Sequence, residues 1–220
     1  MVRIMILPNV KDVVSIILTM KMMILCCVIT VKSAGIMGLS QLDFEDLRGY
    51  AIMIKVLFIC HGNICRSPMS EFILKDMVER HRLTDRFEIA SAATSTEEIW
   101  GGRGNPIYPP ARQSLKRHGI GDTPYTDFSG KRARQVMRSD YTYYDYLLCA
   151  DVNNVRNTIR ITGPDVDNKI KLLLDFSEDE SRHGQSIADP WYTNRFEDTY
   201  EDIVLGCTGF LNYCQSFGML

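Results

Sequence analysis

From residue 53 onward, apolar residues follow two patterns: short continuous runs, and longer stretches in which they recur every three or four positions. The continuous run at 54–59 is typical of a strand that is buried on both faces of a parallel sheet. The stretch that follows, 67–82, places Met69, Phe72 and Ile73 on one side of a helix. The pattern therefore predicts a buried strand followed at once by an amphipathic helix.

The alternation of strand and helix continues toward the C-terminus. The later predicted elements are strand 87–92, a Gly- and Pro-rich loop at 100–110, a helix ending at His118, strand 144–150, helix 151–160, strand 169–176 and helix 196–213. Strands that alternate with helices indicate an α/β fold, here a single domain with a four-stranded parallel sheet flanked by helices on both faces. Active sites in such sheets lie beyond the carboxyl ends of the strands.

The segment Cys60-His-Gly-Asn-Ile-Cys-Arg-Ser67 follows the first predicted strand and carries the candidate chemistry. A strand that turns through such a loop into a helix points backbone N–H groups into one concavity, which binds a tetrahedral oxyanion such as phosphate. The helix dipole and Arg66 favour the thiolate of Cys60, which is its nucleophilic form. A phosphate loop with an activated nucleophile indicates a phosphatase that works through a cysteinyl-phosphate.

Simpler interpretations of these cysteines are available. A buried Cys is usually a small hydrophobic filler, and a Cys-x5-Arg spacing arises by chance in many chains. Cys60 and Cys65 lack the close pair spacing and the second cluster that zinc prefers. The strand before the loop, the helix after it, the interior Gly62 and Pro68 at the first helical turn favour catalysis. We therefore expect neither a metal nor another cofactor.

Residues 60–68 resemble, at every defined position, the loop Cys-x-Gly-Asn-x-Cys-Arg-Ser-Pro of the low-molecular-weight protein tyrosine phosphatases. A second signature of that family, an Asp-Pro-aromatic-aromatic run, is similar to Asp189-Pro-Trp-Tyr192. The resemblance extends from about Met53 to the C-terminus. It implies an enzyme that hydrolyses phosphotyrosine in a phosphotyrosine-containing protein.

The resemblance also implies a role for each residue of these motifs. Cys60 attacks phosphorus, and Arg66 binds two phosphate oxygens as a planar fork that Lys cannot copy. Asp189 acts first as the general acid that protonates the phenolate and then as the base that activates water; its alternative role is a turn initiator. Backbone N–H groups of the loop hold the remaining phosphate oxygens. The loop residues are His61, where the family often has an apolar residue, Gly62, Asn63, Ile64 and Cys65.

Four polar residues are expected to support the loop. Ser67 is either a plain helix N-cap or, as the resemblance implies, also a hydrogen-bond donor to the thiolate. Asn63 either tolerates a left-handed turn or braces the loop. The resemblance implies that it braces the loop together with Ser91 and His118. Taken alone, His118 fits a helix-end histidine that interacts with the C-terminal dipole.

Three aromatic residues and a second thiol complete the candidate site. Trp191 and Tyr192 are either surface-loop aromatics or, by resemblance, the cleft wall on which a tyrosine ring stacks. Trp100 is our candidate for the aromatic of the family's substrate loop, although 96–106 does not align cleanly with it. Cys65 is either a buried filler or the partner of Cys60 in a reversible protective disulfide.

Three other functions are considered for this loop. Thioredoxin-coupled arsenate reductases need two further cysteines; Cys149 suits the first, but 151–169 contains no partner. Phosphoarginine phosphatases have a similar loop in which Thr takes the position of Ile64. The bulkier Ile therefore favours phosphotyrosine as the substrate. A non-catalytic phosphate-binding module would lack Cys60 or Asp189, and both are present.

The composition of the chain limits the classes of binding partner and the cellular compartment that we expect. The chain has 25 basic and 27 acidic residues, a balance that gives no electrostatic footprint for nucleic acid. Its seven cysteines, an odd number at irregular spacings, do not suggest a secreted disulfide framework. Because a thiolate enzyme needs a reducing compartment, we expect the protein in the cytoplasm.

Residues 1–52 differ from the rest of the chain. The segment 13–31 is nearly all apolar and just reaches the length of a bilayer span, but Lys21 near its middle disfavours insertion. A cleaved signal peptide would have a long n-region and would expose the thiolate to oxidation. We expect an N-terminal extension that results from a mis-called start, with the phosphatase domain at 53–220. A membrane anchor at 13–31 is the alternative, and membrane contact is expected only if that segment is made and inserted.

Overall fold

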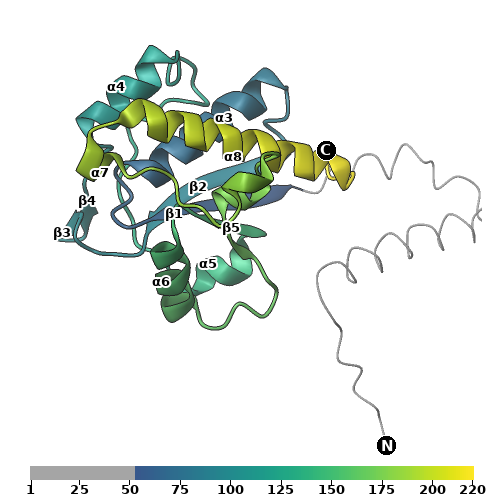
Figure 1. The fold of residues 1–220 in the computed structure, drawn as a ribbon. Helices are drawn as coiled ribbons and strands as arrows, with labels where there is room; N and C mark the ends of the chain where they lie inside the picture. Colours follow the sequence, from purple (N-terminus) through teal and green to yellow (C-terminus); the bar gives the residue numbers. More distant parts are fainter. Residues whose placement is uncertain (1–52) are drawn as a thin grey trace, which may run out of the picture. The chain divides into compact units, whose positions relative to one another are not determined.

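Residues 53–220 are described by the computed structural model, which shows a central sheet with helices on both faces (Figure 1). The sheet has four parallel strands in the order β2, β1, β5, β6. Their bounds are Ile54–Cys60 for β1, Phe87–Ala93 for β2, Tyr146–Cys149 for β5 and Ile170–Leu172 for β6. The predicted α/β fold with a four-stranded parallel sheet is confirmed.

The apolar run in β1 is continuous because this strand is covered on both sides. Successive side chains of a strand point to opposite faces of the sheet. Accordingly Val56 and Phe58 belong to one hydrophobic cluster, and Leu57 and Ile59 belong to the other. With β2 on one side and β5 on the other, β1 is an inner strand of the sheet.

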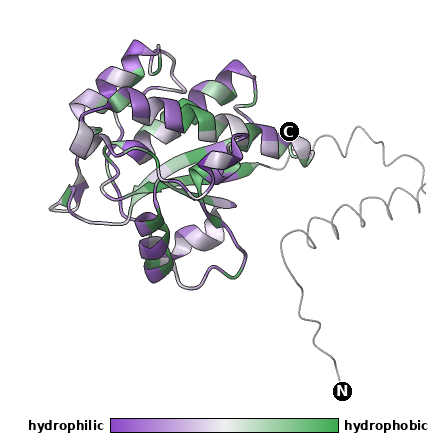
Figure 2. Cartoon of the chain, in the orientation of Figure 1, coloured by the Kyte–Doolittle hydropathy of each residue, from purple (hydrophilic) through white to green (hydrophobic). Residues whose placement is uncertain are grey.

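Different helices cover the two faces of the sheet. The first face packs against α3 (Arg66–Arg80), α4 (Pro109–Arg117) and α8 (Phe196–Ser216). The second face packs against α5 (Arg138–Tyr143) and α6 (Val152–Thr162). Figure 2 shows the hydrophobic colour concentrated on the strands and the hydrophilic colour on the outer parts of the helices. This distribution is the one expected for two cores separated by a sheet.

The predicted strand at 169–176 is only half correct, because its second half is the 3-10 turn η1 (Leu173–Phe176). Leu173 and Leu174 are adjacent and both fully buried, and they belong to the same cluster on one side of the sheet. A strand would have pointed them to opposite faces. The turn also packs closely on α8: a Cβ atom at Gly209 would lie 1.8 Å from the backbone oxygen of the last η1 residue.

Several short elements were not predicted. The Gly- and Pro-rich loop contains an antiparallel hairpin of β3 (Ile99–Trp100) and β4 (Arg103–Gly104). Gly101 and Gly102 form its turn with φ angles of 56° and 78°, which a two-residue hairpin turn of type I′ requires. The other unpredicted short elements are α5, η2 (Glu180–Arg182) and α7 (Pro190–Thr193).

Residues 53–165 and 169–220 form one compact unit. The predicted apolar segment 13–31, like the rest of 1–52, lies outside the described residues. Within the described part of the chain, no helix combines the length and the apolar character that crossing a bilayer demands.

Candidate active site

The loop between β1 and α3 gathers hydrogen-bond donors around the sulfur of Cys60. Cys60 is the last residue of β1, and only 3% of it is exposed. The backbone N–H of Asn63 points at Sγ from 3.3 Å, and Oγ of Ser67, in the first turn of α3, lies 3.1 Å from Sγ. Asn63 has a φ of 57°, the left-handed conformation that Asn tolerates better than most residues. Donors at these positions stabilise a thiolate.

Arg66 lies at the start of α3 with its guanidinium between two carboxylates. Its Nη1 is 2.7 Å from Oδ2 of Asp151, and its Nη2 is 2.7 Å from Oδ2 of Asp189. Burial alone would lower the pKa of Arg66, but the negative charges of Cys60, Asp189 and Asp151 raise the pKa above its ordinary value. The guanidinium is therefore a permanent cation within the electrostatic reach of Cys60.

The two carboxylates reach Arg66 from separate helix N-termini. Asp151 caps α6 by accepting a hydrogen bond from the backbone N–H of Asn154 at 2.7 Å. Asp189 caps α7 by accepting one from the N–H of Trp191 at 3.1 Å. Each carboxylate uses one oxygen as the cap and the other for Arg66, so the turn-forming role of Asp189 and its place in the site are compatible.

A polar network supports the inner side of the loop. The side-chain Nδ2 of Asn63 donates to Oγ of Ser67 and to Oγ of Ser91, each at 2.8 Å. Ser91 then donates to Oε2 of Glu71 at 2.7 Å, and Nζ of Lys131 lies 2.6 Å from the same oxygen. The structure thus brings Asn63, Ser67 and Ser91 together, as expected.

His118 lies elsewhere, which corrects the expectation that it braces the loop. Its Nε2 is 2.7 Å from Oε2 of Glu197, and its ring stacks on that of Tyr200 with centroids 3.6 Å apart. Both of these partners belong to α8, so His118 joins the end of α4 to that helix. The far end of the network that begins at Asn63 is held by Glu71 and Lys131 instead.

The outer side of the loop contacts the segment around the β3–β4 hairpin. Nε2 of His61 lies within hydrogen-bond distance of Oε2 of Glu97, at 2.9 Å. Gly62 lets Glu98 approach closely, because a Cβ atom at Gly62 would lie 3.0 Å from Cγ of Glu98. The carbonyl of Ile64 accepts a hydrogen bond from the N–H of Tyr108 at 2.9 Å.

Cys65 belongs to the same loop as Cys60 and is buried as a free thiol. Burial, followed by the neighbouring charges of Cys60 and Asp189, raises the pKa of Cys65 to about 12. Cys65 therefore remains protonated at neutral pH. Its protective disulfide with Cys60 stays a prediction.

The three candidate aromatic residues, which we call the rim, are all exposed. Trp191 is 57% exposed, Tyr192 85% and Trp100 72%. Trp191 contacts the ring of Tyr108 with centroids 5.4 Å apart, whereas Trp100 lies in the β3–β4 hairpin. Trp191 and Tyr192 follow Asp189 directly in α7, so the carboxylate on Arg66 and these two rings share one short helix.

Three residues of the site were missed by sequence reasoning: Asp151, Glu71 and Lys131. For Asp151 a signal was present, because an Asp that follows a buried strand of a parallel sheet stands at the edge where active sites form. Glu71 and Lys131 left no such signal. They are 60 positions apart in the sequence, and only the fold shows that they meet.

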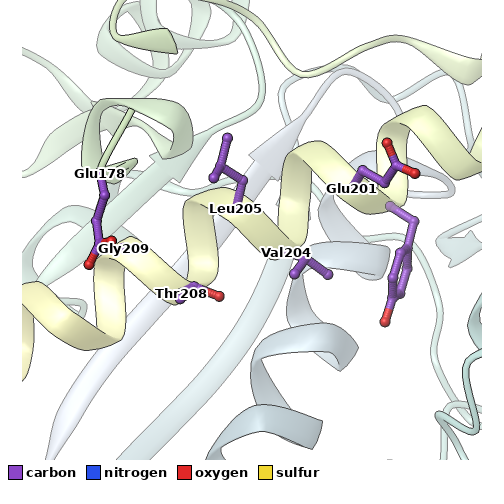
Figure 3. Close-up of a pocket in the computed structure, with 7 residues that line it drawn as sticks. Glu178, Glu201, Val204, Leu205, Thr208 and Gly209 are labelled. Atoms are coloured by element: carbon purple, nitrogen blue, oxygen red, sulfur yellow. The ribbon is translucent and has the colours of Figure 1, made fainter. Parts of the chain in front are cut away.

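A separate shallow hollow lies on the outer surface of α8 (Figure 3). Its lining residues are Glu178, Tyr200, Glu201, Val204, Leu205, Thr208 and Gly209. None of them belongs to the 60–67 loop or to the run that begins at Asp189, so the hollow is distinct from the candidate active site.

A thiol in an anion-binding loop, together with an arginine and a carboxyl group, is typical of a cysteine-dependent phosphoester hydrolase. Comparison with known proteins agrees with this class. The family model described as "Low molecular weight phosphotyrosine protein phosphatase" matches residues 55–217. The chain therefore belongs to the low molecular weight phosphotyrosine protein phosphatase family.

Similar proteins come from bacteria and animals. The low molecular weight protein-tyrosine-phosphatase YfkJ of Bacillus subtilis is 36% identical over 159 residues, which cover 72% of this chain and 94% of that protein. The human low molecular weight phosphotyrosine protein phosphatase is 37% identical over 158 residues, covering 71% and 92% of the two chains. The crystal structure of YfkJ superimposes with a TM-score of 0.66 at 34% identity and covers 76% of this chain and 98% of that one.

Proposed function

We propose that this chain hydrolyses phosphotyrosine in proteins through a cysteinyl-phosphate intermediate on Cys60. One observation carries the proposal. The sulfur of Cys60 accepts a hydrogen bond from the N–H of Asn63 and lies 3.1 Å from the hydroxyl of Ser67, and the buried Arg66 stands between Asp151 and Asp189 in the same site. Membership of the phosphatase family supports the same reaction.

In the first step, the phosphate of the substrate replaces Asp189 as the partner of Nη2 of Arg66, while Asp151 remains bound to Nη1 and orients the guanidinium. The thiolate of Cys60 attacks phosphorus, and the bond between phosphorus and the tyrosine oxygen breaks. The electron pair leaves with the phenolate oxygen, which takes the proton of Asp189. Backbone N–H groups of the loop and Arg66 stabilise the charge on the equatorial oxygens.

In the second step, a water molecule attacks the phosphorus of the cysteinyl-phosphate. Asp189, now ionised, takes a proton from this water, and the thiolate of Cys60 leaves. Inorganic phosphate is then released, and Asp189 has regained its proton for the next cycle. Ser67, whose hydroxyl lies 3.1 Å from the sulfur, stabilises the departing thiolate.

The alternative reactions find less support in the structure. An arsenate reductase would relay a disulfide through Cys149, but this thiol is fully buried and its oxygen neighbour is Thr158. Burial raises the pKa of Cys149 to about 12, so the thiolate that such a relay needs is disfavoured. For a phosphoarginine phosphatase, Ile64 is the opposing feature, because Ile is bulkier than the Thr expected at this position of the loop.

Steady-state kinetics on four substrates tests the proposal. Purified full-length protein is assayed with phosphotyrosine, phosphoserine, phosphoarginine and arsenate, with thioredoxin and its reductase present for arsenate. We expect turnover of phosphotyrosine only. Cys60→Ser should abolish turnover and leave phosphate binding measurable by calorimetry. Turnover of phosphoarginine or arsenate instead, or activity in Cys60→Ser, would contradict the proposal.

The remaining parts of the proposal concern domain, compartment and substrate. We assign the phosphatase domain to 53–220, supported by the family match to 55–217 and by the position of every site residue in that range. A thiolate nucleophile that loses activity on oxidation suits a reducing compartment, for which we propose the cytoplasm. The protein partner is a phosphotyrosine-containing substrate.

A further inference from the structure

The residue before Asp189 has both of its backbone groups held by side chains of α8. The carbonyl of Ala188 accepts a hydrogen bond from Oγ1 of Thr199 at 2.8 Å. The N–H of Ala188 donates to Oδ2 of Asp202 at 2.9 Å. Thr199 and Asp202 are three positions apart and therefore lie on the same side of the helix. Both peptide groups that flank Ala188, including the one that leads into Asp189, are thus tied to α8.

Each of these two side chains has a defined orientation. Thr199 is fully buried, and the other acceptor near its hydroxyl, the carbonyl of Arg195, is farther away at 3.4 Å. The hydrogen of Oγ1 therefore goes to Ala188. The carboxylate of Asp202 uses its other oxygen, Oδ1, to bind Nη2 of Arg182. Because both of its oxygens are engaged, this carboxylate keeps Oδ2 on Ala188.

The chain is anchored once more just before Ala188. The N–H of Ile187 donates to the carbonyl of Ala150 at 2.9 Å, and the Ile187 side chain is buried in the cluster on the first face of the sheet. Ala150 directly precedes Asp151, the other carboxylate of the site. The helix that follows Asp189, α7, is a single turn with two exposed aromatic side chains. The position of Asp189 is therefore set mainly from its N-terminal side.

This anchoring matters because burial alone does not fix the carboxyl group of Asp189. The side chain is 28% exposed, although its Oδ2 lies 2.7 Å from Nη2 of Arg66. A substrate phosphate that binds Nη2 would replace that contact and leave the backbone to keep the carboxyl group in place. Proton transfer depends strongly on this place, since a misplacement of about 1 Å can cost roughly a hundredfold in rate.

We propose that Thr199 and Asp202 are positioning residues of the phosphatase, which hold the two peptide groups of Ala188 and so keep Asp189 where it protonates the leaving group. Both residues act through the backbone and do not touch the substrate. The proposal rests on Asp189 being the general acid of the proposed function.

The leaving-group dependence of kcat/KM in Thr199→Val tests this role. The substitution keeps the shape of the side chain and removes the hydroxyl that binds Ala188. With phosphotyrosine, kcat/KM should fall about tenfold, because its phenolate needs the proton of Asp189. With p-nitrophenyl phosphate, whose phenolate leaves unprotonated, kcat/KM should fall less than about twofold. Equal losses on both substrates would overturn the proposal.

Two matched variants give the comparison. Thr199→Ser keeps a hydroxyl for the carbonyl of Ala188 and should restore most of the parent kcat/KM on phosphotyrosine. Arg182→Met removes the other partner of Asp202 but leaves Oδ2 for Ala188, so its loss should be less than half that of Thr199→Val. A loss in Thr199→Ser or in Arg182→Met as large as in Thr199→Val would overturn the proposal, because the bonds to Ala188 would then not be the cause.

A double-mutant cycle shows whether the effect passes through Asp189. When Thr199→Val is added to Asp189→Ala, no carboxyl group is left to position. The further loss on phosphotyrosine should then be less than about twofold. A further loss as large as in the parent background would mean that Thr199 acts independently of the general acid, which contradicts the proposal.

A second cut guards against misfolding, and thermal unfolding is measured for each variant. If Thr199→Val unfolds without a cooperative transition, Asp202→Ala removes the other bond to Ala188 at a less buried position. It should show the same difference between the two substrates, and equal losses would refute the positioning role.

Hydrogen exchange of the peptide 186–193, followed by mass spectrometry, reports on the segment without catalysis. Exchange should be faster in Thr199→Val and Asp202→Ala than in the parent, because the bonds that hold Ala188 are weakened. Unchanged exchange in both variants would overturn the proposal. A parent without activity on phosphotyrosine would refute the proposed function, whereas the exchange comparison would still decide whether α8 holds the segment.

Discussion

The floor and the rim of the candidate site are built in opposite ways. The floor consists of Cys60, Asn63, Arg66 and Ser67, all of them at most 5% exposed and all hydrogen-bonded. The rim consists of Trp191, Tyr192 and Trp100, which are mostly exposed. A buried polar group must keep its partners, so the floor tolerates one geometry, whereas rim side chains can change at little cost in stability. We infer that the floor determines the reaction and the rim determines the choice of substrate.

The largest effect is expected for Arg66→Lys, which breaks the floor. An ammonium is a point charge that cannot bind two phosphate oxygens, and it leaves Asp151 or Asp189 without its ion-pair partner. The kcat/KM for phosphotyrosine should fall about a hundredfold to a thousandfold. Steady-state kinetics measures this loss, with thermal unfolding as the control for folding. Near-normal kcat/KM would show that Arg66 is structural only.

Asp189→Ala separates the two regions, because Asp189 touches Arg66 in the floor and begins the helix of the rim. The kcat on phosphotyrosine should fall about a hundredfold or more, because its phenolate leaves poorly without a proton. On p-nitrophenyl phosphate, whose phenolate leaves unprotonated, the loss should stay below about tenfold. Equal losses on both substrates would mean that Asp189 only positions its segment.

The smallest effect is expected at the rim. Tyr192→Ala should raise KM for a phosphotyrosine peptide about three- to tenfold through lost stacking, with kcat nearly unchanged. Tyr192→Phe keeps the ring and should behave as the parent does. Inhibition by inorganic phosphate, which needs only the floor, should be the same in all three proteins. A fall in kcat with unchanged KM would place Tyr192 in the chemistry and remove the distinction between floor and rim.

The fold was predictable where local pattern and burial agree. The apolar run in β1 and the helical spacing in α3 each identify one element, and the structure confirms both. Prediction failed at Leu173 and Leu174, because consecutive buried residues suit either a strand covered on both faces or a turn packed on one. The turn is favoured by the close packing of η1 on Gly209 of α8. Because α8 is distant in the sequence, local pattern could not reveal this contact.

The candidate site was predictable as far as its residues lie in contiguous motifs. The loop that begins at Cys60 and the run that begins at Asp189 could be identified because their chemistry depends on local spacing. The support behind the loop depends on contacts between distant segments. In that support His118 was assigned wrongly, because it binds Glu197. The residue that binds Glu71 at the end of the network is Lys131. A histidine and a lysine can both donate to a carboxylate, so residue type alone did not distinguish them.

The ion pair between Arg66 and Asp189 has a consequence for small anions in solution. The carboxylate of Asp189 is tethered to the same chain, so it competes for Nη2 at a high effective concentration that dilution does not reduce. A free anion must displace this internal competitor, and its apparent affinity falls by the fraction of molecules in which Nη2 is occupied. Every anion that needs Nη2 bears this same factor, so a tight ligand must gain further bonds in the loop, as a phosphoryl group would by engaging the loop N–H groups and Arg66 at once.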